Sequence, residues 1–337
     1  MWTGPAALRM ERERLEDLVA QVNAGTAPAA ARIAVLVPCY NEAGTIGQVV
    51  ADFRSALPGA EIYVYDNNST DGTAEAARAA GAVVRRAPQQ GKGNVIRLMF
   101  ADIEADAYVL VDGDGTYDAA DAPAMVARLL DDCLDMVSGA RVSQEQAAFR
   151  SGHRLGNRVL NGLVHRIFGR AFGDMLTGYR VMSRRFVKSF PAHSEGFETE
   201  TELTIHALKL RLPTEEAPTA YRARPEGSES KLNTVRDGMR ILGLIGMLVR
   251  EERPLLFFSA AAGAALLLSG GLMGLVLTDF LRLGAVPRFP TLIVAVGFAV
   301  LSMLSFACGV ILDSVARGRL EQRRLAYLAL PAPGRRS

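Results

Sequence analysis

The sequence predicts an α/β protein in which helices cover a mainly parallel sheet, followed by a C-terminal hairpin of two transmembrane helices. Between about residues 33 and 142, short apolar runs alternate with longer amphipathic stretches, which is the pattern of successive βαβ units. After Pro254, two apolar segments are each long enough to cross the hydrocarbon core of a bilayer. Amphipathic helices between these two parts are expected to lie at the interface with lipid.

The composition limits the class of protein. The 337 residues are 49% hydrophobic and 22% charged, which suits a folded catalytic unit joined to something smaller. A net charge of +2 argues against nucleic acid as a partner, because duplex binding needs a strongly basic face. The three cysteines show neither metal-ligand nor disulfide spacing, so a reduced compartment is expected.

The expected sheet is built from five apolar runs. These are residues 33–37, 62–65, 82–84, 108–111 and 136–137. Amphipathic stretches near 44–56, 71–80, 91–105 and 121–132 are expected to form the helices on both faces. Polar clusters follow several of the runs, at the edge where open α/β sheets bind ligands.

The second half of the chain changes in character. Residues 153–172 carry apolar side chains at helical spacing together with several arginines, so this helix either lies on lipid or packs on the sheet with a solvated basic face. Segments 254–278 and 290–312 contain no charge and are the predicted spans. Arginines flank the pair on its outer sides and exceed Arg282 and Arg288 in the loop, so both flanks are expected in the cytoplasm. The alternative is a buried hairpin in a soluble protein.

These features predict five regions. They are a charged extension (1–31), a catalytic domain (32–232), an amphipathic juxtamembrane helix (233–253), two transmembrane helices (254–313) and a basic cytoplasmic tail (314–337). The extension is charged where a signal peptide would be apolar, which predicts a catalytic domain that stays in the cytoplasm. A homo-oligomer is expected from residues that permit close helix contact, Gly263, Gly270, Gly271 and Gly274.

The sequence Asp112-Gly-Asp-Gly-Thr116 directly follows an apolar strand. Alternation along the chain points the carboxylates of Asp112 and Asp114 to one face, where they can hold Mg²⁺ or Mn²⁺. An EF-hand is excluded because Tyr117 stands where that loop requires glycine. The pair alone is as compatible with an ordinary Asp-Gly turn as with a metal site. Polar motifs at 38–42 and 65–73 favour the metal site. Part of the second motif is equally explained by helix capping.

Taken in order, these motifs resemble the family-2 glycosyltransferases of the GT-A (Rossmann-like) fold. The resemblance continues through residues 91–93, 112–114, 138–141 and 174–180. Residues 222–232 look like the arginine and Ser-Lys-Leu element of dolichyl-phosphate mannose synthase and the bacterial polyprenyl-phosphate glycosyltransferases. It covers roughly residues 31 to 240. It implies inverting transfer from a UDP- or GDP-sugar to undecaprenyl or another polyprenyl phosphate, giving a lipid-linked monosaccharide for cell-envelope glycan or glycoconjugate synthesis.

The resemblance implies roles for individual residues. The nucleotide-sugar would be bound by Pro38, Tyr40, Asn41, Glu42, Tyr65, Asp66, Asn67, Lys92, Gly93, Asp112, Gly113 and Asp114. Mg²⁺ or Mn²⁺ would be held by Asp112, Asp114 and Thr116. The acceptor phosphate would meet Arg141, Arg222, Arg224, Ser230 and Lys231. The residues expected to act in catalysis are Asp114, Arg141, Asp174 and Lys231. Thr116 and Asn67 depart from the common family pattern, which leaves the donor open.

The acceptor decides whether a general base is needed. A polyprenyl phosphate is already an anion near neutral pH and needs aiming and charge balance, whereas a hydroxyl must lose a proton. Asp174 falls where sugar-acceptor relatives place their base, so it is either a positioning residue or that base. The carboxylates at 198–202 either stabilise a helix N-terminus or line the acceptor site.

Two other functions stay open at this point. One is a membrane glycosyltransferase that acts on a lipid or glycan hydroxyl, and the other is a non-catalytic membrane subunit that binds nucleotide-sugars. In each case the expected location is the cytoplasmic (inner) membrane, crossed more than once, with the catalytic domain facing the cytoplasm. The expected partners are a nucleotide-sugar, polyprenyl phosphate and membrane lipid.

Overall fold

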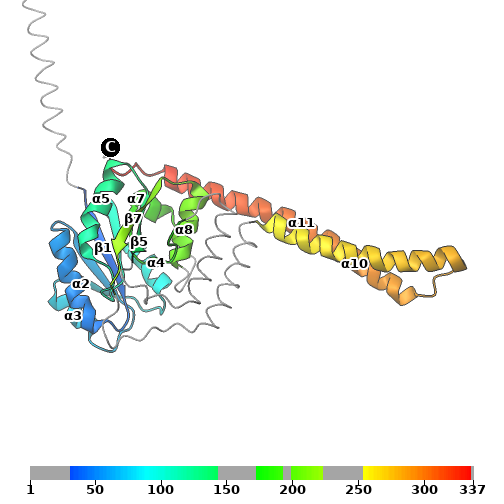
Figure 1. Cartoon of the computed structure of the whole chain (residues 1–337), viewed down its shortest axis with the longest axis horizontal. Helices are drawn as coiled ribbons and strands as arrows, with labels where there is room; N and C mark the ends of the chain where they lie inside the picture. The colour runs from blue at the N-terminus through cyan, green and yellow to red at the C-terminus, as the bar shows by residue number, and fades with distance from the viewer. Residues whose placement is uncertain (1–30, 143–171, 193–198, 223–252, 335–337) are drawn as a thin grey trace, which may run out of the picture.

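The computed structural model describes residues 31–142, 172–192, 199–222 and 253–334. Figure 1 shows a unit of sheet and helices, the predicted catalytic domain, from which two long antiparallel helices project. The predicted amphipathic helices at 153–172 and 233–253 lie almost entirely outside the described residues, as does the charged extension at 1–31.

Within the described residues, one seven-stranded mixed sheet has the strand order β3-β2-β1-β4-β6-β5-β7. The strands are β1 (Ile33–Cys39), β2 (Glu61–Asp66), β3 (Val83–Arg86), β4 (Ala107–Leu110), β5 (Met136–Val142), β6 (Arg180–Ser183) and β7 (Thr214–Ala220). Strands β1 to β4 are parallel, and β5 is parallel to β7. Strand β6 runs antiparallel between β4 and β5. The predicted mainly parallel sheet is confirmed, although the sequence did not predict β6 or β7.

Two hydrophobic cores lie on opposite faces of the sheet, as the alternation along the strands requires. In β1, Ala34 and Leu36 face one core while Val35 and Val37 face the other. The helices are α2 (Ala43–Ala56), α3 (Thr73–Ala79), α4 (Lys92–Asp102), η1 (Ala119–Asp121), α5 (Ala122–Asp131), α7 (Arg184–Ser189) and α8 (Thr199–Leu210). Helices α2, α3 and α5 cover one face, and α4, α7 and α8 cover the other.

The apolar C-terminal segments form α10 (Pro254–Leu283) and α11 (Phe289–Leu328), which pack against each other as a hairpin. Two serines cross the interface: Ser269 Oγ donates to the carbonyl of Ala295 at 2.7 Å, and Ser302 Oγ donates to that of Ala262 at 2.8 Å. These bonds satisfy hydroxyls that water could not reach in a bilayer. Gly309 lets the helices approach, because a Cβ there would lie 2.9 Å from Cβ of Phe258.

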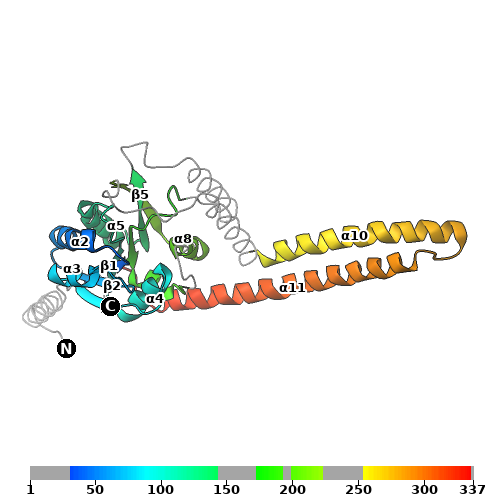
Figure 2. The same ribbon diagram turned by 90° about the horizontal axis from the view of Figure 1, so that it is seen from below.

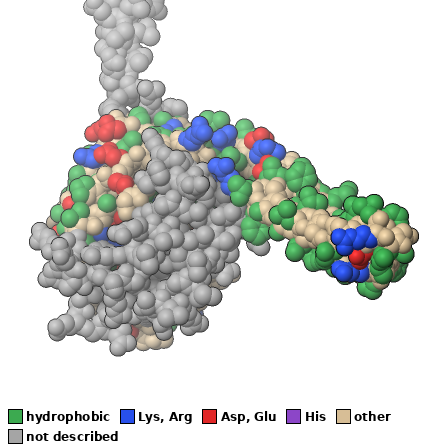
Figure 3. All heavy atoms as spheres, turned by 45° about the vertical axis from the view of Figure 1, so that its right-hand side comes forward, with side chains coloured by type: hydrophobic (Ala, Val, Ile, Leu, Met, Phe, Trp, Pro, Cys, Tyr) green, Lys and Arg blue, Asp and Glu red, His purple; other side chains and the backbone are tan. Residues whose placement is uncertain are grey.

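Both helices are long and apolar enough to cross a membrane. Only 22% of the apolar window of α10 and 17% of that of α11 is buried, so most of the apolar surface of the hairpin is exposed in this chain. In Figure 3, hydrophobic side chains cover its sides and charged ones gather at its tip. There Arg288 pairs with Asp279 at 3.0 Å. The glycines on α10 that were expected to permit oligomer contacts do not pack against α11, and the oligomer stays a prediction.

The helix α11 continues without a break past residue 313, the predicted end of the second transmembrane segment, to Leu328. It reaches the unit of sheet and helices, where it contacts α7 and α8. Figure 2 shows the helix running from the hairpin to the side of the sheet. Most of the region predicted as a cytoplasmic tail is therefore part of the helix α11.

Candidate active site

The loops that follow β1, β2 and β4 meet at one edge of the sheet, because these neighbouring strands are parallel. The first two loops organise each other. Asn41, in a left-handed backbone conformation at φ 55°, donates its backbone N–H to Ser69 Oγ at 2.9 Å, while its side-chain oxygen accepts from the N–H of Thr70 at 2.9 Å. Glu42 N–H donates to Thr73 Oγ1 at 2.9 Å. Polar residues of both motifs thus build the loop backbone.

Three carboxylates converge at the end of β4. Asp112 and Asp114 flank Gly113, and a Cβ at Gly113 would overlap the carboxylate of Glu42. One oxygen of Glu42, Oε2, is buried without a hydrogen-bond partner. Burial, and then the charges of Asp112 and Asp114, raise the pKa of Glu42 to about 8. At the same edge of the sheet, burial and then the charge of Glu42 raise the pKa of the Cys39 thiol.

Lys92 supplies positive charge to this cluster. Its ammonium group lies 2.5 Å from Asp112 Oδ1 and also donates to Glu200, a buried residue at the start of α8. Burial opposes the charge on Lys92, but the two carboxylates outweigh it, and its pKa lies above the ordinary value. Asn67 builds the loop that leads to this lysine: its side chain donates to the carbonyls of Ala87 and Gln89 and accepts from Gly91 N–H.

The neighbours of the two aspartates fix their side chains. Thr116 donates its hydroxyl to Asp114 Oδ1 at 2.6 Å and its backbone N–H to the same oxygen at 3.1 Å. Gly178 lies against Asp112, because a Cβ there would overlap that carboxylate. The N–H of Gly178 donates in turn to the hydroxyl of Tyr117 at 2.8 Å. The sequence after β4 and the segment before β6 therefore shape the site together.

The cluster suits a hard divalent cation. It places more carboxylate than ammonium charge at one point, and it leaves Glu42 Oε2 without a hydrogen-bond partner among the described residues. No three His, Cys, Asp or Glu side chains in the described ranges are arranged to enclose a metal. A Mg²⁺ or Mn²⁺ ion held by Asp112 and Asp114 would complete its shell with phosphate oxygens and water, as these ions do. Thr116 acts here through Asp114.

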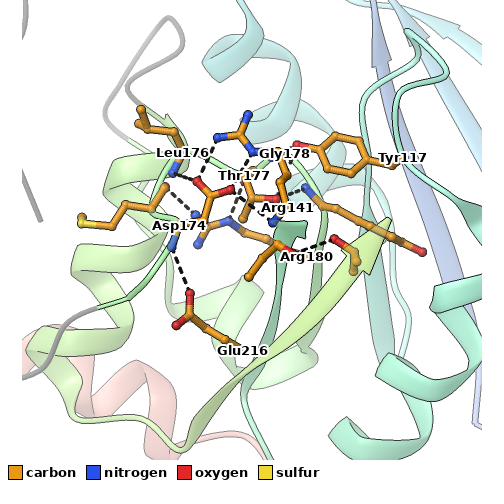
Figure 4. Close-up of polar contacts among 12 residues, drawn as sticks. Tyr117, Arg141, Asp174, Leu176, Thr177, Gly178, Arg180 and Glu216 are labelled. Atoms are coloured by element: carbon orange, nitrogen blue, oxygen red, sulfur yellow. Dashed lines mark hydrogen bonds and ion pairs between the residues drawn. The ribbon is translucent and has the colours of Figure 1, made fainter. Parts of the chain in front are cut away.

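Arg141 and Asp174 form a second charged pair, shown in Figure 4. Arg141 Nε and Nη2 donate to the two carboxylate oxygens of Asp174 at 2.6 and 2.9 Å. The guanidinium group also lies over the ring of Tyr221, 5.4 Å from its centroid. Burial opposes the charge on Arg141, but Asp174 outweighs it and raises its pKa. This bidentate pair fixes the position of the Asp174 carboxyl group.

Two groups around this pair were not predicted as site residues. Glu216 on β7 accepts the backbone N–H groups of Gly173 at 2.9 Å and Asp174 at 3.2 Å. Arg180 is fully buried and donates to the carbonyls of Met175 and Thr177 and to Thr204 Oγ1. Burial lowers its pKa to about 10. Both residues fix the backbone of the 173–177 turn, which no local sequence pattern indicates.

Several predicted binding residues lie elsewhere. Tyr65 is fully buried in the core, and its hydroxyl donates to Asp102 at 2.9 Å. Asn67 is only 3% exposed and has its amide engaged within the chain. Pro38 and Gly93 are buried, whereas Tyr40 is exposed at 42% beside the site. The geometry gives Tyr65 and Asn67 packing and loop-building roles in place of direct donor contacts.

The predicted acceptor residues are partly outside the described ranges, because Arg224, Ser230 and Lys231 fall within 223–252. Arg222 is described and pairs with Asp118 at 2.5 Å. It borders a cavity of about 240 Å³ beside Asp112, whose other walls include Tyr117 and residues of α2. Among the described residues, this cavity adjoins the carboxylate of Asp112.

Comparisons with known proteins agree with this geometry. The model of the family "Glycosyl transferase family 2" matches residues 34–190. Glycosyltransferase AglJ of Haloferax volcanii is 35% identical over 234 residues, which cover 69% of this chain and 77% of that protein. A dolichyl-phosphate hexose transferase of the same organism is 29% identical over 221 residues, covering 66% of this chain and 95% of that protein.

The fold is also found among solved structures. Glucosyl-3-phosphoglycerate synthase of Mycobacterium tuberculosis, crystallised with Mn²⁺, UDP and phosphoglyceric acid, matches with a TM-score of 0.54 and 22% identity over 65% of this chain and 78% of that chain. At this identity the likeness concerns the fold, and it confirms the predicted GT-A architecture.

The raised pKa of Glu42 predicts a pH-dependent stability. The unfolded chain releases this proton near pH 4.5, whereas the folded chain keeps it until about pH 8. The unfolded chain thus binds fewer protons between these values, so the free energy of unfolding falls as pH rises through this window. Denaturant unfolding of the full chain, in detergent with a chelator, should show that the free energy of unfolding falls less over this pH window in Glu42→Gln than in the wild type. The exposed Glu75→Gln should match the wild type, and equal slopes in all three would contradict the assignment.

The contact between Gly178 and Asp112 predicts a metal-binding defect. Gly178→Ala should displace the Asp112 carboxylate and weaken Mn²⁺ binding in the presence of UDP by roughly tenfold, the effect of losing about 1.4 kcal/mol. Isothermal titration calorimetry measures it. Gly173→Ala is the matched control, because a Cβ there meets Glu216 only at 3.5 Å, an ordinary contact. Unchanged Mn²⁺ affinity in Gly178→Ala would remove Asp112 from the metal site.

Proposed function

The chain belongs to glycosyl transferase family 2, and on that premise we propose that it transfers a sugar from a UDP- or GDP-sugar to the phosphate of undecaprenyl or another polyprenyl phosphate. The observation that carries the proposal is the joining of two charged clusters to an apolar hairpin in one chain. The carboxylates at β4 face the donor, and the Arg141–Asp174 pair lies where an acceptor would approach. The hairpin brings both to a lipid surface.

The donor side is the edge formed after β1, β2 and β4. Tyr40 and Asp66 lie at the ends of the first two strands, near the base and ribose, and Lys92 faces the diphosphate. A Mg²⁺ or Mn²⁺ ion held by Asp112 and Asp114 would neutralise charge on the departing nucleoside diphosphate. Two glutamates adjust the charge around the two aspartates. Glu42 adds a carboxyl group, and Glu200 balances the charge of Lys92.

The acceptor side depends on charge instead of proton transfer. A lipid phosphate is already an anion, so its oxygen can attack the anomeric carbon without a general base. Arg141 and Arg222 would bring guanidinium charge to the lipid phosphate, and Arg224 and Lys231 would add to it. Direct displacement inverts the anomeric centre. The pairing of Asp174 with Arg141 supports a positioning role for that aspartate.

The membrane arrangement follows from charge. The arginines before α10 and after the apolar part of α11 outnumber those at the hairpin tip, so we place both flanks and the catalytic unit in the cytoplasm. A relative described as a dolichyl-phosphate hexose transferase supports a lipid phosphate as acceptor. The lipid-linked sugar would then serve the synthesis of cell-envelope glycans or glycoconjugates.

A transfer assay tests the proposed reaction. Vesicles containing the full chain should move label from one member of a panel of UDP- and GDP-sugars to undecaprenyl phosphate, and a chelator should stop transfer. Asp114→Asn should lower the rate by roughly a hundredfold or more, because a metal contributes several kcal/mol to such a transition state. Asp131→Asn, on the exposed end of α5, should leave the rate unchanged. Transfer that resists both chelation and Asp114→Asn would refute the metal assignment.

The role of Asp174 separates a phosphate acceptor from a hydroxyl acceptor. Asp174→Asn should raise KM for the lipid phosphate, because Arg141 loses its anchor, and should leave the shape of the pH–rate profile unchanged. Glu216→Gln, which weakens the same turn without touching Arg141, should have a smaller effect in the same direction. A general base would behave differently: kcat would fall by about 10² or more and the acid limb of the profile would disappear. That result would favour a lipid or glycan hydroxyl.

A further inference from the structure

The part of α11 beyond its apolar segment packs against the unit of sheet and helices. Residues 313–328, here called the α11 extension, continue the helix for roughly 24 Å at about 1.5 Å per residue. They mix charged and apolar side chains and include Arg317, which pairs with Asp313 at 2.9 Å. The extension contacts α7 and α8, on the face of the sheet opposite α2, α3 and α5. A helix that only ended a membrane span would not need this length.

A docking cluster of Asp135, Arg185 and Tyr327 fastens its end to the catalytic unit. The Asp135 side chain is fully buried and accepts from the Tyr327 hydroxyl at 2.8 Å and from Arg185 Nε and Nη2 at 2.5 and 2.9 Å. Ser183 Oγ donates to the same carboxylate at 2.7 Å. The guanidinium group of Arg185 also stacks on the Tyr327 ring, 4.7 Å from its centroid. Tyr327 therefore completes a buried charged pair.

The chain beyond α11 adds a second point of attachment. Gly334, in a left-handed conformation at φ 76°, lies so close to α5 that a Cβ would come within 2.6 Å of the carbonyl oxygen of Leu130. In Figure 1 the segment that follows α11 runs to α5. A second point of attachment restricts the rotation that a single contact would allow.

The extension rests on helices that carry the active site. Helix α8 contains Glu200, which binds Lys92 and through it Asp112. Helix α7 directly follows β6, whose first residue is the buried Arg180 beneath the 173–177 turn. The membrane span, the docking cluster and the catalytic carboxylates are thus linked by packed secondary structure.

We propose that the α11 extension is a rigid support that holds the catalytic unit at a fixed height and tilt above the bilayer, with Tyr327 as its positioning residue. The inference rests on the proposed function, because a lipid phosphate is confined to the membrane surface and must meet the sugar there. A misplacement of about 1 Å can cost a hundredfold in rate, so a fixed height has a clear use. A substrate free in solution would gain nothing from it.

Tyr327→Ala tests the proposal in lipid nanodiscs without requiring activity. Electron cryomicroscopy of the full chain should show one orientation of the catalytic unit relative to the disc, and Tyr327→Ala should show several or lose the unit on averaging. Tyr327→Phe, which keeps the ring under Arg185, should lie between them. Leu325→Ala changes an exposed side chain on the same helix turn and should match the wild type. A single unchanged orientation in Tyr327→Ala would overturn the proposal.

Kinetics distinguish support from general damage. With undecaprenyl phosphate in vesicles, Tyr327→Ala should lower kcat/KM by roughly tenfold. With a short, water-soluble prenyl phosphate in detergent it should stay within about twofold of the wild type. Equal loss with both acceptors would mean that the residue only stabilises the fold, which contradicts the proposal.

An insertion varies the height alone. Seven alanines placed after Ser314 add about two helical turns and roughly 10 Å, while returning the docking face to nearly the same side. The catalytic unit should move away from the disc, and transfer in vesicles should fall while transfer to the soluble acceptor remains. An unmoved unit would overturn the support role. A wild type that transfers to neither acceptor would instead refute the proposed function, with the disc images still deciding on the support.

Discussion

The excess of carboxylate charge at the end of β4 is the constraint on which the rest of the site depends. Buried carboxylates repel each other, and the single ammonium group of Lys92 balances only part of their charge. The surrounding elements position the residues of this cluster. Asn67 builds the loop before α4, α8 carries Glu200, and Gly178 leaves room for the side chain of Asp112. A divalent cation would relieve this repulsion and could also bind the oxygens of a departing diphosphate.

Charge also separates the proposed donor side of the site from the proposed acceptor side. In the proposed reaction the carboxylates serve the donor, while Arg222 borders the cavity beside Asp112 and Arg141 pairs with Asp174. Asp174 fixes the guanidinium group of Arg141, and Glu216 fixes the turn that carries Asp174. An acceptor that brings its own negative charge fits such a surface, and in our proposal the α11 extension sets the position of that surface relative to lipid.

The sequence predicted the parts that depend on local pattern. Apolar runs gave β1, β2 and β4, amphipathic spacing gave α2 and α5, and long apolar segments gave the hairpin. It did not predict β6, because an antiparallel strand inserted between β4 and β5 is set by tertiary pairing. Tyr65 was misjudged since a polar motif does not say which side chain turns into the core. Tyr327 meets Asp135 across 192 positions, and no local pattern carries that information.

The central claim is that Asp112 and Asp114 hold a divalent cation that serves the leaving diphosphate. A structure of the full chain with Mn²⁺ and UDP, located by the anomalous scattering of manganese, tests it most directly. The account predicts one strong peak that touches both carboxylates and the diphosphate oxygens. A peak elsewhere, or a diphosphate bound with neither aspartate near it, would contradict the account.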